Sequence, residues 1–388
     1  MTGAFHQGKD PCDYVGLPDA ACRLAHIPVG ELYQLNDGPG LSRERDPEFM
    51  VGGTHWNDKY RFTSWPAAAS QDWFGAIGGI TAGPDKAVWF AEKNGNVGRI
   101  AMNGGFTEFP VSNVYPGKAP DLVAFAKDIQ QGYGDTVLFI SLWGADRMAN
   151  MKIDGATVGP ANPFMLASVA LGGEAIGGMA AGPDGNIWIS ETRSLKIWAY
   201  PDKEYKVPNG GEPMGIVRGP DNAMWFVDGY AKIGRIATPE STWSDCCGGA
   251  KGTIQEFPVP TSTAGIGSIA VGPDGALWFT EVQANKIGTI TTAGVIREFG
   301  LSSNTCPQGI AGGPDGAVWF TEPCANRIGR IAPDGSISEI PIPNSPGGHP
   351  IAITTGPDGN LWFTEAGQLD PQSPKLNPKV ERLEIEAR

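Results

Sequence analysis

The sequence repeats one signature seven times, and this repetition constrains the fold more than any other feature. Each copy combines a Gly-Pro-Asp turn, an apolar-Trp-Phe strand that ends in an acid, and a following strand of the type Asn-Lys-Ile-Gly-Arg-Ile. A degraded copy spans 133–155, where Leu138 takes the Trp position and Ser141 the acid position. The Trp-equivalent positions lie roughly 40 to 50 residues apart, which is the period of a four-stranded propeller blade.

These copies predict an all-β fold, a seven-bladed β-propeller over residues 71–388, in a chain that is a single domain overall. The 55 glycines and 33 prolines favour many short strands joined by tight turns. Residues 1–70 match no copy and are predicted to form an irregular N-terminal cap. This segment also holds a candidate ring-closing strand, 30–36, that could lie beside the alternating segment 380–386 of the last blade.

Charge and hydropathy exclude several classes of partner. The formal charge is -13 without a cluster of Lys and Arg, which argues against binding to nucleic acid or to an anionic membrane surface. No run of 18 apolar residues occurs, so no membrane span is expected. We expect a monomer whose partner is a small molecule.

The six cysteines lack the spacing of a metal site, so disulfides are the better interpretation. Counting residues outward from the turn at 313–316 places Cys306 opposite Cys324 on neighbouring strands, which predicts a cross-strand disulfide. A disulfide between Cys12 and Cys22 could pin the N-terminal cap. The adjacent Cys246 and Cys247 could form a vicinal disulfide, or each could pair with another partner. Disulfides indicate an oxidising compartment, so we expect a secreted or lumenal protein whose signal peptide is absent from this sequence.

The same counting places Gln308 opposite Glu322 and predicts a ring of acids near one mouth of the propeller. Six copies carry an acid at the equivalent position, namely Glu92, Glu191, Asp228, Glu281, Glu322 and Glu365. Each acid could be architectural, bonded to backbone N–H groups or to a nearby Lys or Arg. Alternatively, one or two of them, with Glu322 and Glu281 as the candidate ligands, could hold Mg or Ca or act as a general base.

The segments "GPDGALWFTE" with "NKIGTI" and "GPDGAVWFTE" with "NRIGRI" closely resemble the streptogramin B lyase (virginiamycin B lyase) family of seven-bladed propellers, and the resemblance covers about 83 to 367. It implies the opening of a cyclic depsipeptide antibiotic by elimination, with magnesium. It also implies that Glu322 is a metal ligand. The family's catalytic His, however, falls on Gln308, and its second Glu falls on Cys306.

His349 is the one histidine on a repeat and is expected to lie diagonal to Glu365. It is either a hydrogen-bonded structural residue or half of an acid/base pair. The candidate catalytic residues are therefore Gln308, Glu322, His349 and Glu365. Candidate substrate-binding residues are aromatics outside the repeat pattern and one methionine, namely Trp56, Trp65, Trp73, Trp143, Trp243 and Met214.

The leading hypothesis is a secreted enzyme of the lyase or cyclase type, acting on a hydrophobic natural product in a pocket at the propeller axis. Because the family's base is replaced, a pericyclase of secondary metabolism would suit the site, since cycloaddition can proceed on orientation and exclusion of water. Such a reaction would require either no cofactor or a divalent cation, Mg or Ca. The alternatives are a streptogramin-type C–O lyase that uses Mg, a related calcium-dependent lactonase, a non-catalytic propeller that binds carbohydrate or peptide, and a scaffold for protein partners.

Overall fold

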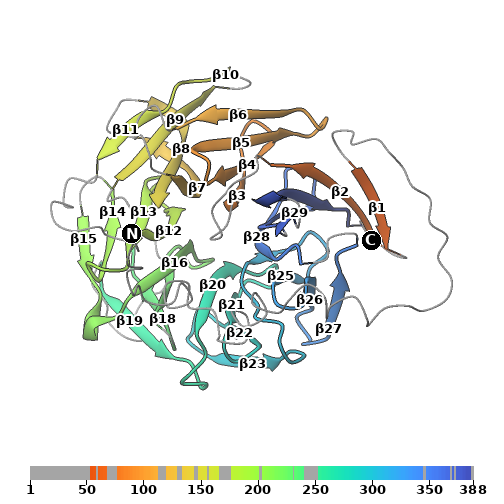
Figure 1. The fold of residues 1–388 in the computed structure, drawn as a ribbon. Coiled ribbons are helices and arrows are strands. Elements are labelled where there is room, and N and C mark those ends of the chain that lie inside the picture. The colour runs from red at the N-terminus through yellow and green to blue at the C-terminus, as the bar shows by residue number, and fades with distance from the viewer. Residues whose placement is uncertain are drawn as a thin grey trace, which may run out of the picture. The chain divides into compact units, whose positions relative to one another are not determined.

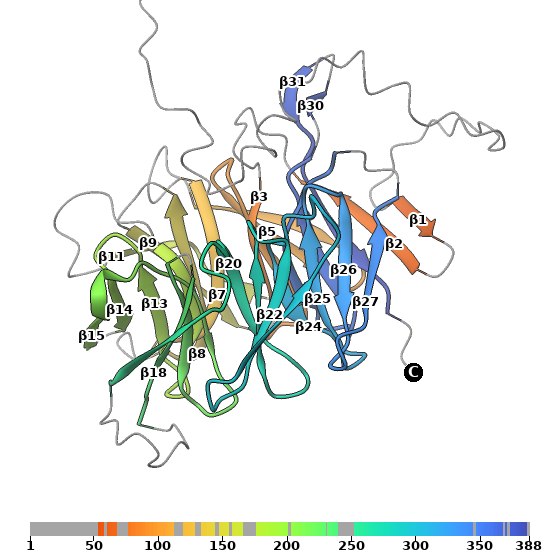
Figure 2. The same ribbon diagram turned by 90° about the horizontal axis from the view of Figure 1, so that it is seen from below.

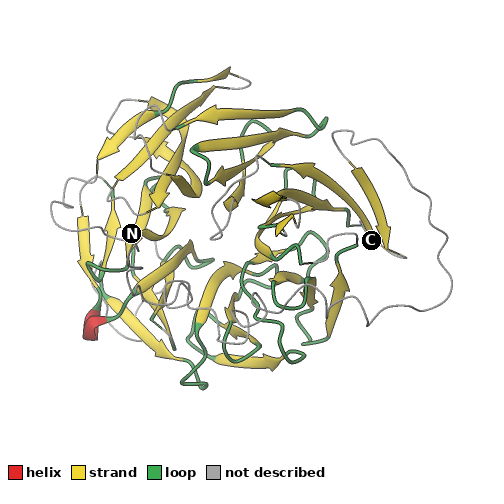
Figure 3. Ribbon diagram, viewed as in Figure 1, coloured by secondary structure: helices red, strands yellow, loops and turns green. Residues whose placement is uncertain are grey.

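The described strands assemble into seven sheets of four or five strands arranged around one centre (Figure 1). This is a computed structural model, and almost every described element in it is a strand (Figure 3). Viewed from the side, the strands run roughly along the ring axis (Figure 2). The prediction of an all-β, seven-bladed propeller is confirmed. The structure describes residues 53–385 except 58–59, 68–76, 112–118, 129–132, 144–146, 155–156, 166–175, 201–202, 230, 240–251, 344–346, 368 and 371–372.

Each blade has four antiparallel strands that follow one another outward from the centre. The inner strands are β3 (Ile77–Ala82), β7 (Ala119–Asp128), β12 (Ile176–Ala181), β16 (Pro213–Arg218), β20 (Ile266–Val271), β24 (Ile310–Gly312) and β28 (Pro350–Thr355). The second strands are β4 (Ala87–Glu92), β8 (Tyr133–Trp143), β13 (Ile187–Glu191), β17 (Met224–Asp228), β21 (Leu277–Glu281), β25 (Val318–Glu322) and β29 (Leu361–Glu365). They carry the buried Trp and Phe of the repeat.

The third strands are β5 (Asn96–Ala101), β9 (Arg147–Asp154), β14 (Lys196–Ala199), β18 (Lys232–Ile236), β22 (Lys286–Ile290), β26 (Arg327–Ile331) and β32 (Lys379–Leu383). The outer strands are β6 (Phe106–Pro110), β10 (Thr157–Val158), β15 (Lys203–Lys206), β19 (Ile254–Pro258), β23 (Ile296–Gly300), β27 (Ile337–Pro341) and β2 (Tyr60–Pro66). Additional described elements are β1 (Gly53–Asn57), β11 (Asn162–Met165), the 3-10 helix η3 (Pro208–Gly210), and the hairpin of β30 (Leu369–Asp370) and β31 (Ser373–Leu376).

The ring is closed by an N-terminal strand in the last blade. Strand β2 pairs antiparallel with β32, so that Ser64 lies opposite Glu381. Glu381 is buried, and its carboxyl accepts a hydrogen bond of 2.7 Å from the Ser64 hydroxyl. The pairing expected for the last blade was with residues 30–36, which lie outside the described residues. Strand β2, which pairs with β32 in the last blade, also lies within residues 1–70.

In the described part of the chain, a hydrogen bond from Trp to Asp fixes the turn before the second strand in six blades, and in four of them an Arg of the third strand joins the pair. In the sixth blade, the Trp319 indole N–H donates to Asp315 at 3.0 Å, and the Arg330 guanidinium donates to the same carboxylate at 2.7 Å. The Arg330 guanidinium also lies 5.8 Å from the Trp319 ring centre, a cation–π contact. The Asp of the Gly-Pro-Asp turn therefore orients the Trp that packs between neighbouring blades.

A β-bulge opens the inner strand at the other mouth. In every blade except the sixth, the ladder shifts by one residue near the start of the inner strand, as between Pro350 and Ile353. The sixth blade shows the same feature, because Gln308 N–H donates to the Thr321 carbonyl while Thr321 N–H donates to the Gly309 carbonyl. Two residues of the inner segment, Gln308 and Gly309, thus lie opposite one residue of the second strand, Thr321. Gln308 does not lie opposite Glu322, as a uniform ladder would require.

In the fifth, sixth and seventh blades, the threonine of the repeated Trp-Phe-Thr-Glu segment holds the bulge and joins it to the next blade. The Thr321 hydroxyl accepts from Gly309 N–H at 2.8 Å and donates to the Ile351 carbonyl of the seventh blade at 2.8 Å. The Thr280 hydroxyl donates in the same way to the Gln308 carbonyl at 2.9 Å. The backbone N–H of one bulge and the backbone carbonyl of the next therefore both have hydrogen-bond partners. These bonds also fix neighbouring blades relative to each other.

The hydrogen bond from the bulge N–H to a side-chain hydroxyl also corrects the alignment of the degraded second copy with the other copies. The Ser141 hydroxyl accepts from Leu122 N–H at 3.0 Å, as the Thr321 hydroxyl accepts from Gly309 N–H. Ser141 therefore occupies the threonine position and not the acid position. By the same shift of one residue, Phe139 takes the Trp position that was assigned to Leu138, and an apolar residue, Leu142, takes the acid position.

Replacing Thr321 by valine should lower the free energy of unfolding by about 2 kcal/mol, because one buried N–H and one buried C=O lose their partner. Urea unfolding monitored by Trp fluorescence measures the difference. The control is Thr107→Val at an exposed position of β6, which should change stability by less than about 0.5 kcal/mol. Equal effects of the two substitutions would show that the hydroxyl bridge contributes nothing.

Candidate functional site

The acid positions lie at the ends of the second strands and are all buried. Each side chain is at most 2% exposed: Glu92, Glu191, Asp228, Glu281, Glu322 and Glu365. The acidic ring expected from the repeat thus places its carboxyl groups between the blades.

At two of these positions, the basic side chain opposite the acid binds a different carboxylate. Glu281 pairs with Lys286 in the ladder, but the Lys286 ammonium lies 2.7 Å from Glu298 on the outer strand. Arg327, opposite Glu322, likewise lies 2.6 Å from Glu339. Among the described residues, no hydrogen-bond partner reaches either carboxyl oxygen of Glu281 or Glu322. The expected bonds to backbone N–H or to Lys and Arg are therefore not formed at these two positions.

Burial favours the protonated form of these carboxyl groups. Desolvation, with repulsion from Glu339 and against the attraction of Arg327, raises the pKa of Glu322 to about 8. Desolvation, with repulsion from Glu298, raises the pKa of Glu281 to about 7. A neutral carboxyl between blades avoids the cost of a buried charge.

The bulge residues present different side chains at the mouth. Gln308 is half-buried, and its carbonyl accepts the bond from Thr280. Met214 stands at the equivalent place in the fourth blade, since its carbonyl accepts a bond from the Ser190 hydroxyl of the third blade. Met214 is 36% exposed, and of the large apolar residues in the described segments only Val295 is also exposed. Met214 and Gln308 therefore offer one apolar and one amide group.

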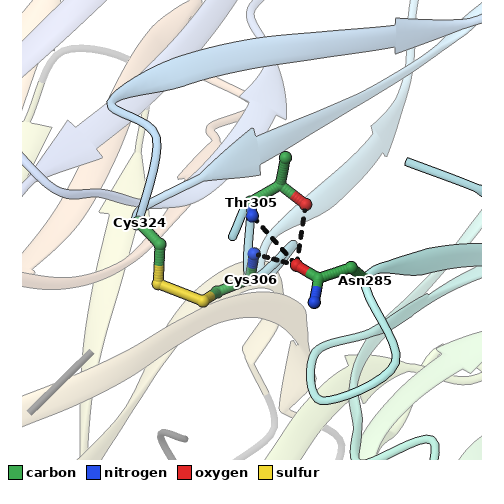
Figure 4. The surroundings of a disulfide bond; sticks show 4 residues. All are labelled: Asn285, Thr305, Cys306 and Cys324. Atoms are coloured by element: carbon green, nitrogen blue, oxygen red, sulfur yellow. Dashed lines mark hydrogen bonds between the residues drawn. A yellow bond between two sulfur atoms is a disulfide. The ribbon is translucent and has the colours of Figure 1, made fainter. Parts of the chain in front are cut away.

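The predicted disulfide between Cys306 and Cys324 is confirmed, with an S–S distance of 2.12 Å and a Cα–Cα distance of 5.6 Å. It joins the approach to inner strand β24 with the residues that follow β25 (Figure 4). Cys306 is buried and has a left-handed backbone, with φ of 51°. The cysteines at 12, 22, 246 and 247 lie outside the described residues.

His349 occupies the same place in the seventh blade that Cys306 occupies in the sixth, with φ of 50°. Its carbonyl accepts from Ala366 N–H at 3.1 Å, next to Glu365. The residue as a whole is exposed, whereas its ring is desolvated by neighbouring protein and donates a hydrogen bond to the Pro323 carbonyl of the neighbouring blade. Desolvation by the surrounding protein lowers the pKa of His349 below its ordinary value, although this bond opposes the shift.

The predicted aromatic residues are placed as follows. Trp65, on β2, is buried; it stacks on Trp362 with ring centres 4.9 Å apart, and its indole N–H donates to Gly104. Trp56 lies on β1 and Trp143 ends β8, but their side chains are not described. The residues at 73 and 243 lie outside the described segments.

The described residues do not fit the magnesium site that the family resemblance implies. They contain no group of three or more His, Cys, Asp or Glu side chains disposed to hold a metal ion. Glu322 is present, but Gln308 stands where the family has its His, and Cys306, where it has its second Glu, is in a disulfide. A disulfide sulfur and an amide do not replace a carboxylate and an imidazole.

The fold is that of a seven-bladed propeller, and comparison with known proteins shows which propellers it is similar to. The virginiamycin B lyase family model matches residues 246–370. A streptogramin B lyase structure is 29% identical, with a TM-score of 0.67, and the match covers 84% of this chain and 98% of that chain. The chain is thus a virginiamycin B lyase-like propeller, with Gln308 at the position of the catalytic His.

Two structures of the enzyme from Staphylococcus aureus give the same result. Its virginiamycin B lyase is 28% identical, with a TM-score of 0.67, over 84% of this chain and 99% of that chain. A catalytically inactive variant, determined with quinupristin, is 28% identical, with a TM-score of 0.68, over 84% of this chain and 100% of that chain. In the described residues of the present chain, no helix is long and apolar enough to cross a membrane.

The raised pKa of Glu322 makes stability depend on pH. Between its ordinary value of 4.5 and about 8, the folded state must retain a proton that the unfolded state has released, so stability falls as pH rises. In Glu322→Gln this loss is absent, and the variant should gain about 2 to 4 kcal/mol relative to the unchanged protein between pH 5 and pH 8. Urea unfolding at the two pH values measures it.

The control for this measurement is Glu108→Gln, at an exposed position of β6, which should leave the pH dependence of stability unchanged. Parallel pH profiles for Glu322→Gln and the unchanged protein would show that Glu322 is ionised in the folded state.

Proposed function

We propose that this chain is a lyase-type enzyme of small-molecule metabolism in which His349 is the general base. The likeness to solved streptogramin B and virginiamycin B lyases supports the reaction class. The observation that carries the proposal is the state of His349, an exposed residue at the mouth with one ring nitrogen bonded to the Pro323 carbonyl. The base has moved from the sixth blade, where Gln308 stands, to the seventh.

His349 has the properties that a base requires near neutral pH. Because desolvation lowers its pKa, the ring is unprotonated at pH 7. The N–H that bonds Pro323 leaves the lone pair on the other nitrogen, which can accept a proton. A carboxyl that is fully buried and protonated, such as Glu322, cannot do so.

The reaction we propose is an elimination next to a carbonyl group. His349 takes the proton, the electron pair of the broken C–H bond forms a C=C double bond, and the neighbouring C–O bond breaks. That second electron pair leaves on oxygen as a carboxylate. The Gln308 amide can donate a hydrogen bond to the substrate carbonyl, where negative charge develops.

The substrate we propose is a largely apolar natural product. Met214 offers an exposed apolar contact on the fourth blade, and Gln308 offers hydrogen bonds on the sixth. The Cys306–Cys324 disulfide is compatible with an oxidising compartment and supports secretion. The proposed reaction uses no divalent cation, because the described residues bring no group of His, Cys, Asp or Glu side chains of the required number together with Glu322 to hold one.

A cyclase of the pericyclic type is the second candidate. The replacement of both the family's His and its second Glu, by Gln308 and Cys306, favours it, since a cycloaddition needs orientation and hydrogen bonding but no base. The two candidates differ in what they require of His349.

Replacing His349 by glutamine should reduce turnover of a cyclic depsipeptide by a factor of about 10² to 10⁴, the usual contribution of a general base. Quinupristin is the probe, and mass spectrometry detects the ring-opened product. The control, Lys86→Gln, has an exposed side chain and a left-handed backbone at the opposite end of a blade, and should retain full activity. Undiminished ring opening by His349→Gln would refute the assigned base. No ring opening by the unchanged protein would refute a streptogramin-type substrate and favour the cyclase.

Dialysis against EDTA should leave this turnover unchanged, because the described residues contain no group of three or more His, Cys, Asp or Glu side chains disposed to hold a metal ion. Metal content of the dialysed protein is measured alongside. Loss of activity that added Mg or Ca restores would contradict the metal-free reaction.

A further inference from the structure

Three successive blades meet around the Cys306–Cys324 disulfide. The Asn285 side-chain oxygen, from the fifth blade, accepts hydrogen bonds from Thr305 N–H at 2.9 Å, from the Thr305 hydroxyl at 3.1 Å and from Cys306 N–H at 3.0 Å (Figure 4). One carbonyl group thereby fixes the backbone that carries the first cysteine. Thr305 is completely buried.

The second cysteine holds the segment that His349 contacts. Cys324 N–H donates to the Thr305 carbonyl at 3.3 Å, so a hydrogen bond and the disulfide both tie Cys324 to the segment that Asn285 fixes. Pro323 lies between Cys324 and the buried Glu322 and is held from both sides. Its carbonyl accepts from Asn326 N–H at 3.4 Å and from the His349 ring.

This chain of contacts ends on the ring nitrogen that decides the tautomer of His349. An imidazole whose N–H bonds a fixed carbonyl keeps its lone pair on the other nitrogen, whereas a ring without that bond exchanges between two tautomers. We propose that the disulfide, braced by Asn285, positions His349 as a base, and that its reduction by a dithiol releases the ring and lowers activity. This proposal rests on the proposed function for the role of the base.

The redox step is balanced by the dithiol. The S–S bond takes up two electrons and two protons to give the thiols of Cys306 and Cys324, and the dithiol closes to its own disulfide. The enzyme would then respond to the thiol–disulfide state of its surroundings. Asn285 and the two cysteines are positioning residues, since none of them needs to touch the substrate.

The experiment is a two-bond ¹H–¹⁵N correlation of the histidine rings in the full-length, ¹⁵N-labelled protein, with and without dithiothreitol. The His349 signals are assigned by comparison with the spectrum of His349→Gln, from which they are absent. We expect a single tautomer in the oxidised protein and averaged ring nitrogens after reduction. The Cys306→Ser, Cys324→Ser double variant should behave as the reduced protein does. Identical His349 spectra in the oxidised and reduced states would overturn the proposal.

If reduction unfolds the chain, the variant Asn285→Ala tests the positioning of His349 instead, because it keeps the disulfide. It should also average the His349 nitrogens, and should lower turnover of quinupristin by up to about 100-fold, the cost of a misplaced catalytic group. The matched control is Asn222→Ala, which removes another asparagine of left-handed backbone, at a turn where it bonds Arg218. A His349 spectrum that is unchanged in Asn285→Ala would also contradict the proposal.

Turnover tests the base, and the nitrogen spectrum tests its positioning, so the two failures are distinguishable. Full activity of His349→Gln would remove the proposed base whatever the spectra show. Averaged ring nitrogens already present in the oxidised protein would overturn the positioning, even if His349→Gln were inactive.

Discussion

The hydroxyl bridge between neighbouring inner strands is the interaction on which the mouth of this propeller depends. Each inner strand contains one residue too many for a regular ladder, which would leave a backbone N–H and C=O without partners. The Thr321 hydroxyl binds the N–H of its own bulge and the carbonyl of the next one. Because the bulges are held in this way, their side chains reach the mouth at fixed positions, with Gln308 in the sixth blade and Met214 in the fourth.

The chemistry at the mouth follows from which groups the blades bury. Carboxyl groups at the ends of the second strands lie between blades, where desolvation raises the pKa of Glu322 and Glu281. His349 is exposed, and its pKa is lowered. Near neutral pH, burial therefore favours the protonated form of Glu322 and the neutral form of the His349 imidazole. Gln308 and Cys306 stand where the resemblance places the family's base and second carboxylate, and in the proposed mechanism His349 of the adjacent blade supplies the base.

Much of this could be predicted from the sequence because the repeat encodes it. The number of blades follows from the copies, and the Cys306–Cys324 disulfide follows from counting residues outward from a turn. The same counting failed for Gln308, because it assumes a uniform ladder and the bulge adds one residue. It also misplaced Ser141 by one position. The repeated Thr carried the missing signal, since a buried hydroxyl requires partners. The contact of His349 with Pro323 joins two blades and has no local signature.

The dependence of kcat/KM on pH, measured with quinupristin, tests most directly which group accepts the proton. The account predicts that kcat/KM rises with pH through one inflection below 6.5, the ordinary value for histidine, and is level above it, because the lowered pKa belongs to His349 in the free enzyme. An inflection near 8 would contradict it, since that value belongs to the buried carboxyl of Glu322.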